Sequence, residues 1–373
     1  WSTDLSSKQE YGRFTGFGRP PENCADYAFL LHMLKSMDPI DGRGAIILPH
    51  GVLFRGGQEE EIRKKLLKCG LIEGIIGLPS NLFYGTIISA CIIVLDKKNA
   101  INRNDIFMID ASRFYVKDGN KNKLREEDIR KITDTYLGRI EEEKYSKIVT
   151  MEEIEKEEYN LNIPRYIDSS NEETIQDLRA HLYGGIPEVD IEKSNKYWNV
   201  APKLKKELFK QNEKIGYLDL AIDKDLINEK IINSEEFIEY SKNLMKKIYI
   251  WEKENKDKLT NVNNKTRVKD LIEIISDSLL KIFEDDKLID KYEAYEFLLE
   301  YYNNILKDDL HLIVENGWIP KLVYGQDKNG KIKKNEFDSD LLPKYIIIRE
   351  YFSKYAKELE DLNNKLNELI QEF

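Results

Sequence analysis

Apolar residues gather into short runs in the first third of the chain. GAIILP (44–49), LIEGIIGLP (71–79) and ISACIIVLD (88–96) each have the length of a strand, and DIFMID (105–110) is a further short one. Between the first two runs, residues 58–69 place apolar side chains at helical spacing. A strand, a helix and then two strands joined by a short loop form an α/β pattern. The short loop predicts that the strand at 88–96 is antiparallel.

A helix is predicted before the first strand, at residues 25–37. Phe29 and Met33 lie on a different face from its main apolar stripe, so we expect the helix to be mostly buried. His32, within it, is then a satisfied core residue rather than a ligand. The main stripe is formed by Tyr27, Leu30, Leu31 and Leu34.

The chain becomes polar and charged from Lys117 onward. Helices are predicted at 125–136 and 151–158, followed by an isolated extended segment, YNLNIPRYID, at 159–168. The rest is predicted to be helical, apart from a small hairpin at 318–337. Its turn residues are Asp327, Asn329 and Gly330.

These patterns predict an α/β region followed by an all-α region. We expect the α/β part at 1–116, a connecting segment at 117–170 and a helical domain at 171–373. The extended segment at 159–168 is expected to pack the first part against the helical one.

The strongest periodic pattern lies at the C-terminal end. Asp338, Ser339 and Asp340 are candidate N-caps there, and Pro343 suits a first helical turn. A helix with so narrow an apolar seam resembles a coiled coil and needs a helical partner. The partner is either this chain's own helices or another subunit, and the pattern does not distinguish the two. The seam residues are Leu341, Tyr345, Ile348, Phe352, Tyr355, Leu359, Leu362, Leu366, Leu369 and Phe373, with spacings that alternate between four and three.

Composition narrows the function further. The 373 residues carry a net charge of −10, whereas a protein that binds nucleic acid alone is usually basic. If DNA is the substrate, another subunit therefore supplies much of the binding. The three cysteines are widely spaced, as expected in a reducing cytoplasm, and the four histidines lack metal-ligand spacing. No apolar run reaches the roughly 18 residues of a membrane span. A start at Trp1 rather than Met suggests a piece of a longer protein.

Four phrases of the sequence carry a family resemblance, in the family's order. They are DYAFLLHMLKSMDPIDGRGAIILPHGVLFRGG, EIRKKLL, IIGLPSNLFYGTIISACIIVL and YNLNIPRY, and the match is dense over residues 13–168. The chain resembles the modification subunit of type I restriction–modification systems, an adenine-specific DNA methyltransferase that uses S-adenosylmethionine. The resemblance implies that residues 1–116 are the C-terminal half of a Rossmann-like methyltransferase sheet.

The family's catalytic motif is absent from this sequence. In the family, a glycine-rich turn after the first strand holds the cofactor, and Asn-Pro-Pro followed by Phe or Tyr holds the target amine. The sequence contains no Asn-Pro-Pro, and its glycine-rich turns at 12–18 and 51–57 do not follow the first strand of such a domain. The resemblance places the missing motif immediately before Trp1–Ser2. We therefore expect no catalytic residue and no metal site in this chain, and most of the S-adenosylmethionine site upstream of it.

Two aromatic residues are candidates for binding. From the pattern alone, Phe83 can simply close the sheet edge. Its distance of six residues from Ser89 resembles that of the family aromatic that stacks on the flipped adenine. Phe29 resembles a residue that lines the cofactor's adenine pocket, although a buried helix explains it equally well.

Three arginines are candidates for contacts with the DNA backbone. Arg13 and Arg19 lie on the loop that follows the missing motif. Arg55 follows the first strand, with Pro49 and His50, at the strand end where α/β sites form. Arg55 can reach a phosphate or merely solvate a loop.

The resemblance implies an enzyme subunit. The intact protein would methylate the exocyclic amine of adenine in double-stranded DNA, together with a specificity subunit and, for cleavage, a restriction subunit. Alternatively, the chain is a non-catalytic assembly module that docks a specificity subunit through its last helix. That docking surface would comprise Leu359, Leu362, Leu366, Leu369 and Phe373. The chain alone is expected to transfer no methyl group and to bind the cofactor weakly or not at all.

Overall fold

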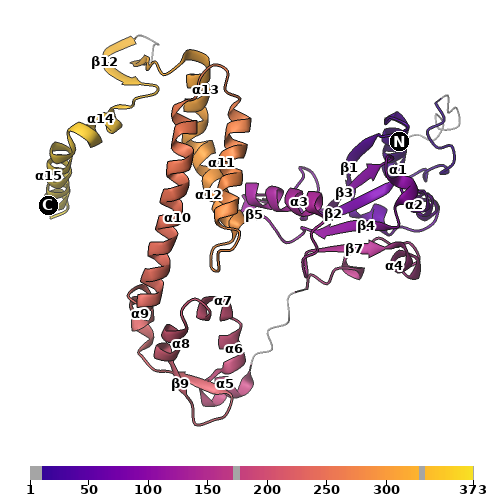
Figure 1. Ribbon diagram of the computed structural model, residues 1–373, viewed down its shortest axis with the longest axis horizontal. Helices are drawn as coiled ribbons and strands as arrows, with labels where there is room; N and C mark the ends of the chain where they lie inside the picture. The colour runs from indigo at the N-terminus through magenta and orange to yellow at the C-terminus, as the bar shows by residue number, and fades with distance from the viewer. Residues whose placement is uncertain (1–10, 171–176, 327–331, 373) are drawn as a thin grey trace. The chain divides into compact units, whose positions relative to one another are not determined.

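A computed structural model describes residues 11–170, 177–326 and 332–372, which fall into two compact units (Figure 1). The first, Trp1–Leu178, is the sheet unit, and the second, Arg179–Phe373, is the helical unit. The helices of the described residues are each too short or too polar to cross a membrane.

The sheet unit is built on five strands in the order β1-β3-β2-β4-β7. β3 is antiparallel to both of its neighbours, which confirms the prediction for residues 88–96. β2 and β4 are parallel, and β7 is antiparallel to β4. The strands are β1 (Arg43–Pro49), β2 (Ile72–Gly77), β3 (Ala90–Asp96), β4 (Asp105–Asp110) and β7 (Ser146–Thr150).

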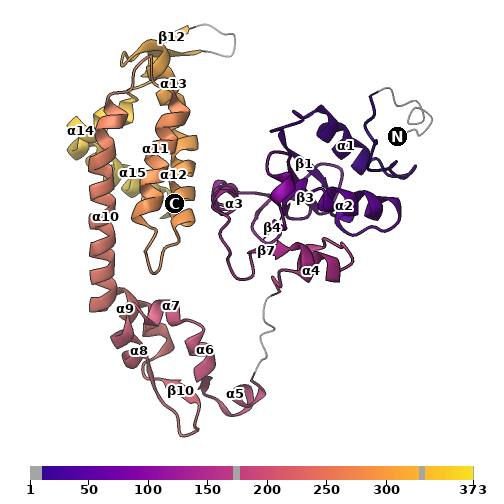
Figure 2. The ribbon, with the colours of Figure 1, turned by 45° about the vertical axis from the view of Figure 1, so that its right-hand side comes forward.

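The central strands are largely apolar because helices cover both faces of the sheet. On β3, Cys91 packs into the core beneath α1 (Asp26–Ser36) and α2 (Gln58–Lys68). Its neighbour Ile92 points to the opposite face and packs with residues of α3 (Glu126–Gly138). Figure 2 shows α1 and α2 on one side of the sheet and α3 on the other.

Helix α1 is buried on one face only. Its predicted apolar stripe is buried, but Phe29 is 62% exposed and His32 is exposed as well. The predictions of a mostly buried helix and of a core histidine are therefore wrong. The sheet covers α1 from one side, so an aromatic residue off the stripe meets solvent.

Residues 117–170 form part of the sheet unit instead of a connecting segment. They supply α3, α4 (Met151–Lys156) and β7, which pairs with β4 along the edge of the sheet. A hairpin of β5 (Val116–Asp118) and β6 (Lys121–Lys123) precedes α3. The polar composition gave no sign of this, because pairing with a distant strand leaves little trace in local sequence.

The extended segment at 159–168 packs into the core of the sheet unit itself. Leu161, Ile163 and Ile167 are buried in the cluster beneath α1 and α2. The Leu161 amide also donates to the Leu53 carbonyl at 2.8 Å. This corrects the expectation that the segment packs the α/β part against the helical one.

The helical unit begins with short helices around a small sheet that the sequence analysis missed. The sheet has three antiparallel strands in the order β8-β10-β9. Its strands are too short, at two to four residues, to give an alternating pattern. The elements are α5 (Leu178–Tyr183), β8 (Ile186–Pro187), α6 (Glu188–Glu192), α7 (Asn195–Trp198), α8 (Pro202–Leu208), β9 (Phe209–Gln211), β10 (Tyr217–Leu220) and α9 (Ile227–Ile232).

Longer amphipathic helices then pack side by side (Figure 2). Ile275 is fully buried between them, and Trp251 donates through Nε1 to Ser278 Oγ at 2.9 Å. A π-helical turn, Tyr302–Leu306, joins the last two helices. The helices are α10 (Glu235–Thr260), α11 (Val268–Ile282), α12 (Lys291–Tyr301) and α13 (Lys307–Asn316).

The predicted C-terminal hairpin is confirmed as β11 (Leu322–Gln326) and β12 (Ile332–Ser339). The predicted turn residues Asp327, Asn329 and Gly330 lie outside the described residues, as do Trp1 and Ser2. Asp338 Oδ1 accepts a hydrogen bond from the Lys344 amide at 2.8 Å, and Pro343 is the N-cap rather than a first-turn residue.

The C-terminal seam forms two helices instead of one. α14 (Lys344–Tyr351) and α15 (Ser353–Glu372) are separated at Phe352, and Leu341 precedes both and packs on the bundle core. The side chains of Leu369 and Phe373 lie outside the described ones. The other seam residues are exposed: Tyr345, Ile348, Phe352, Tyr355, Leu359, Leu362 and Leu366.

Candidate functional site

The candidate site lies at one edge of the sheet. β1 and β2 are both antiparallel to β3, and β4 is parallel to β2, so the carboxyl ends of β1, β2 and β4 meet there. Ligands of α/β sheets bind at such an edge. His50 follows β1, Phe83 lies on the loop that leaves β2, and Asp110 ends β4.

Phe83 borders an apolar groove of about 600 Å³ on the face of the sheet that carries α3. Ile47 and Ile92 form its floor, and Ile129 of α3 forms part of its wall. Phe83 is 38% exposed, whereas a residue that merely closed the sheet edge would be buried. Its neighbour Tyr84 is 95% exposed. The groove therefore offers an aromatic ring beside apolar surface, where a flat apolar or aromatic group can lie.

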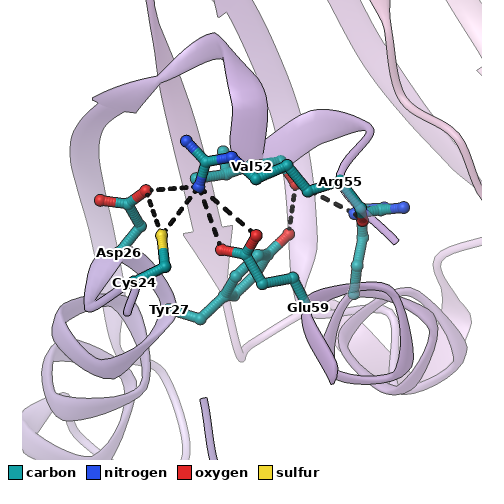
Figure 3. Close-up of polar contacts among 7 residues, drawn as sticks. Cys24, Asp26, Tyr27, Val52, Arg55 and Glu59 are labelled. Carbon is teal, nitrogen blue, oxygen red and sulfur yellow. Dashed lines mark hydrogen bonds and ion pairs between the residues drawn. The ribbon is translucent and has the colours of Figure 1, made fainter. Parts of the chain in front are cut away.

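Arg55 is partly buried and forms ion pairs with acidic side chains (Figure 3). Its Nη1 donates to Asp26 Oδ2 at 2.8 Å and approaches Glu59 Oε1 at 3.3 Å. The hydrogen bond with Asp26, together with the charge of Glu59, raises the pKa of Arg55 although burial opposes this. Asp26 and Glu59 would compete with a phosphate for this charge, and a contact of Arg55 with the DNA backbone stays a prediction.

Cys24 belongs to the same cluster, as Figure 3 shows. Its thiol donates to Asp26 Oδ2 at 3.1 Å and accepts from Arg55 Nη1 at 2.8 Å. Burial and the hydrogen bond to Asp26 raise the pKa of Cys24 to about 11, so it is a thiol at neutral pH. Cys24, Asp26 and Glu59 are close enough to hold a metal ion, but the Arg55 guanidinium already supplies the positive charge among them. A metal site is not indicated here.

Arg63 holds the loop that follows β1 through hydrogen bonds to its backbone carbonyls. This residue is only 2% exposed. Its guanidinium donates to the carbonyls of Val52 at 3.1 Å, Arg55 at 3.0 Å and Tyr159 at 2.8 Å. Tyr27 donates to the same Val52 carbonyl at 2.8 Å. The sequence analysis missed Arg63, because its partners are backbone atoms that no residue type identifies.

His50 and Asp110 approach each other across Gly77. A Cβ atom at Gly77 would lie 3.5 Å from His50 Nε2, 3.6 Å from Asp110 Oδ1 and 2.7 Å from Ile163 Cδ1. Glycine is thus needed for this close packing. His50 Nε2 has no hydrogen-bond partner among the described residues. Burial lowers the pKa of His50, and the charge of Asp110 opposes that shift.

The remaining predicted residues are Phe29, Arg13 and Arg19. Phe29 projects from α1 into solvent, Arg19 is exposed, and Arg13 is half-buried with its guanidinium 5.9 Å from the Phe14 ring. Neither glycine-rich turn forms an open cradle after β1. At Gly51, the Arg55 side chain would lie 2.5 Å from an added Cβ and already fills the space.

Comparison with known proteins relates part of this chain to a family of methylases. Residues 1–175 match the family of N-6 DNA methylases. The sheet unit is related to this family. A type I restriction enzyme methylase subunit, MjaVII of Methanocaldococcus jannaschii, is 38% identical over 176 residues, which are 46% of this chain and 30% of that protein. The MpnII methylase subunit of Mycoplasma pneumoniae is 36% identical over 160 residues, 43% of this chain and 29% of that protein.

A solved structure is also similar to part of this chain. It is the methyltransferase subunit of a type I restriction–modification system from Streptococcus thermophilus. The identity is 44%, over 44% of this chain and 35% of that one, with a TM-score of 0.41. The identity with the MjaVII and MpnII methylase subunits confirms the resemblance to type I modification subunits for the matched part of the chain. The chain spans about a third or less of the length of these relatives, and the matched residues end where the helical unit begins.

Proposed function

We propose that this chain is part of an adenine-specific DNA methyltransferase of a type I restriction–modification system. The reaction would transfer a methyl group from S-adenosylmethionine to the exocyclic amine of adenine in double-stranded DNA. The observation that carries the proposal is the match of residues 1–175 to the N-6 DNA methylases. The strand order supports it: β1-β3-β2, with an antiparallel strand between two others, suits the closing half of a Rossmann-like sheet.

The role of Phe83 in this proposal is to stack on the target base. An enzyme that modifies a base must first turn it out of the duplex, and the extruded base then needs a flat apolar partner. Phe83 is half-exposed at the carboxyl edge of the sheet and borders an apolar groove. These are the properties that such a partner requires.

The described residues do not make a cofactor site by themselves. S-adenosylmethionine supplies the methyl group, and its binding needs a glycine-rich cradle after a strand. Among the described residues, Phe29 is an exposed ring that can cover an adenine, but Arg55 fills the turn after β1. We therefore assign the base cradle to this chain and no step of methyl transfer. The chain alone is expected to show no methyl transfer.

DNA and other subunits complete the proposed assembly. Arg19 is exposed on the loop before α1, and Arg13 lies on the same loop, which suits contacts with the DNA backbone. The exposed seam of α14 and α15 is the proposed docking surface for a specificity subunit, with a restriction subunit joining for cleavage. The net charge of −10 supports this division, because DNA recognition then rests with a partner.

The experiment uses the intact subunit, with its upstream sequence, assembled with the specificity subunit. Phe83→Ala is compared with Tyr84→Ala, a more exposed aromatic residue one position along. Transfer of labelled methyl groups to DNA is measured. Stacking is worth about 1–3 kcal/mol per base, so Phe83→Ala should lower kcat/KM roughly tenfold to a hundredfold. Tyr84→Ala should change it little. Equal losses in both variants, or none, would overturn the role given to Phe83.

A further inference from the structure

The loop that carries Phe83 folds around a single ammonium group. Lys121 Nζ, on β6, donates to Asn81 Oδ1 at 2.9 Å, to the Phe83 carbonyl at 2.7 Å and to the Thr86 carbonyl at 3.1 Å. A lysine ammonium has three N–H donors and no acceptor. Each donor therefore has one acceptor on the loop, and two of these acceptors flank the exposed Tyr84–Gly85 turn.

The neighbouring residue ties the same two segments together. Asn122 is 5% exposed. Its side-chain Nδ2 donates to the Ser80 carbonyl at 2.7 Å, and its backbone N–H donates to the Asn81 carbonyl at 3.1 Å. Asn81 in turn donates through Nδ2 to the Asn120 carbonyl at 2.7 Å. The β5–β6 hairpin is thus bonded to the Phe83 loop on both sides of Lys121.

The backbone of the loop turns sharply at two positions. Asn81 has φ 57° and Gly85 has φ 78°, so both ends of the Phe83 segment are in the left-handed region. Glycine and asparagine adopt this region readily but adopt others as well, so the contacts of Lys121 and Asn122 select one conformation of the loop. The carbonyls of Phe83 and Thr86 also converge, and a positive charge between them relieves their repulsion.

We propose that Lys121 is the positioning residue for Phe83, which it holds in place through the backbone of the loop rather than by touching the base. This inference rests on the proposed function of Phe83 as a base-stacking residue. Arginine cannot replace the lysine here. Its donors are spread over a planar fork, whereas the three acceptors converge on one nitrogen atom.

The structural half of the proposal is tested on the 373-residue chain itself. Hydrogen exchange is measured by mass spectrometry for Lys121→Met and for Lys123→Met, an exposed lysine on the same strand. The amides of Asn81 and Ile88 bond within the loop, to the Ile87 carbonyl and to Thr86 Oγ1. Lys121→Met should speed their exchange at least about tenfold, with the peptides of β3 and β4 unchanged. Exchange that matches the Lys123→Met control would overturn the proposal.

The functional half is tested on the intact subunit with its specificity subunit. Lys121→Met and Lys121→Arg should both lower kcat for methyl transfer about tenfold, with little change in the KM for DNA. Lys121→Met combined with Phe83→Ala should be no worse than Phe83→Ala alone, because both act through the same ring. Full activity of Lys121→Arg would instead indicate a contact with a DNA phosphate and would overturn the proposal. If Phe83→Ala has no effect while Lys121→Met still speeds exchange in the loop, the base-stacking role of Phe83 is wrong. The proposal that Lys121 holds the loop in place is then kept.

Discussion

The two units of this chain differ in how far they bury their apolar residues. In the sheet unit, most apolar side chains of the central strands β2, β3 and β4 are buried beneath helices. In the helical unit, apolar side chains stand in solvent on several helices, including Phe297 at 73%, Met245 at 64% and Leu362 at 64% exposed. Contiguous exposed apolar surface marks a site of interaction. The sheet unit thus buries most of the apolar side chains of its central strands, whereas the helical unit leaves apolar side chains exposed on several of its helices.

Charged residues show the same contrast. Arg63 in the sheet unit is buried and donates to the carbonyl groups of three separate residues. In the helical unit, Asp286 is the nearest counterpart: its side chain is 4% exposed and pairs with Lys247 at 3.0 Å. Three substitutions, in order of their expected effect on the free energy of unfolding, test how far the comparison holds.

Arg63→Met should have the largest effect. It removes the donor for the carbonyls of Arg55 and Tyr159, while Val52 keeps its bond from Tyr27. Each buried carbonyl left without a donor costs about 1–3 kcal/mol, so the free energy of unfolding should fall by roughly 2–6 kcal/mol. Hydrogen exchange should show the sheet unit opening more readily, with the helical unit unaffected.

The matched control is Arg43→Met. Arg43 is 56% exposed and pairs with Glu73 at 2.8 Å on the surface, so its loss should cost under about 1 kcal/mol. Equal exchange in the two variants would show that the hydrogen bonds of Arg63 to the carbonyls of Val52, Arg55 and Tyr159 do not stabilise the sheet unit.

Asp286→Asn should have an intermediate, pH-dependent effect. Burial raises the pKa of Asp286, but hydrogen bonds from Tyr240, the backbone amides of Ile289 and Leu288, and Lys247 outweigh it and lower the pKa to about 2. The unfolded value is about 3.9, so the carboxylate stabilises the fold above about pH 4. That contribution disappears as the pH falls towards 2.

The loss in Asp286→Asn should therefore be roughly 2 kcal/mol at pH 7 and near zero at pH 2. Urea unfolding followed by tryptophan fluorescence measures it, because Trp251 lies in the core of the helical unit. Asp285→Asn, at an exposed position, is the control. A loss of unfolding free energy that does not depend on pH would contradict the lowered pKa of Asp286.

Leu362→Glu combined with Leu366→Glu should have the smallest effect on folding. Both side chains are more than half exposed, so the free energy of unfolding should change by less than about 0.5 kcal/mol. Co-purification with a specificity subunit should nevertheless be lost. Asn364→Glu with Asn367→Glu adds the same charge elsewhere on α15 and should leave binding intact. A double leucine variant that still co-purifies would show that the seam serves this chain alone.

Much of the sheet unit could be predicted from the sequence. The strands at 44–49, 88–96 and 105–110 were found because apolar runs of strand length carry a strong signal. The strands of residues 186–220 were missed because they are only two to four residues long. Phe83 was found through resemblance to a family, and its partial exposure beside a groove supports its selection.

The polar partners could not be predicted. Arg55 follows a strand end, as a ligand-binding arginine would, yet Asp26 and Glu59 already hold it. Lys121 has no motif at all, and its acceptors lie about 40 positions earlier in the chain. Such contacts depend on where distant segments meet, which local spacing does not record.

The order of apolar strands and amphipathic helices, and hence the α/β and helical character of the two units, was determined by the sequence alone. Burial of apolar surface is non-directional, so a periodic pattern suffices to specify it. Only the tertiary structure decided which charge meets which acceptor, and so which residues are free to bind a ligand. Hydrogen bonds and ion pairs require atoms to meet within about 3 Å at defined angles, and only the folded chain sets those positions.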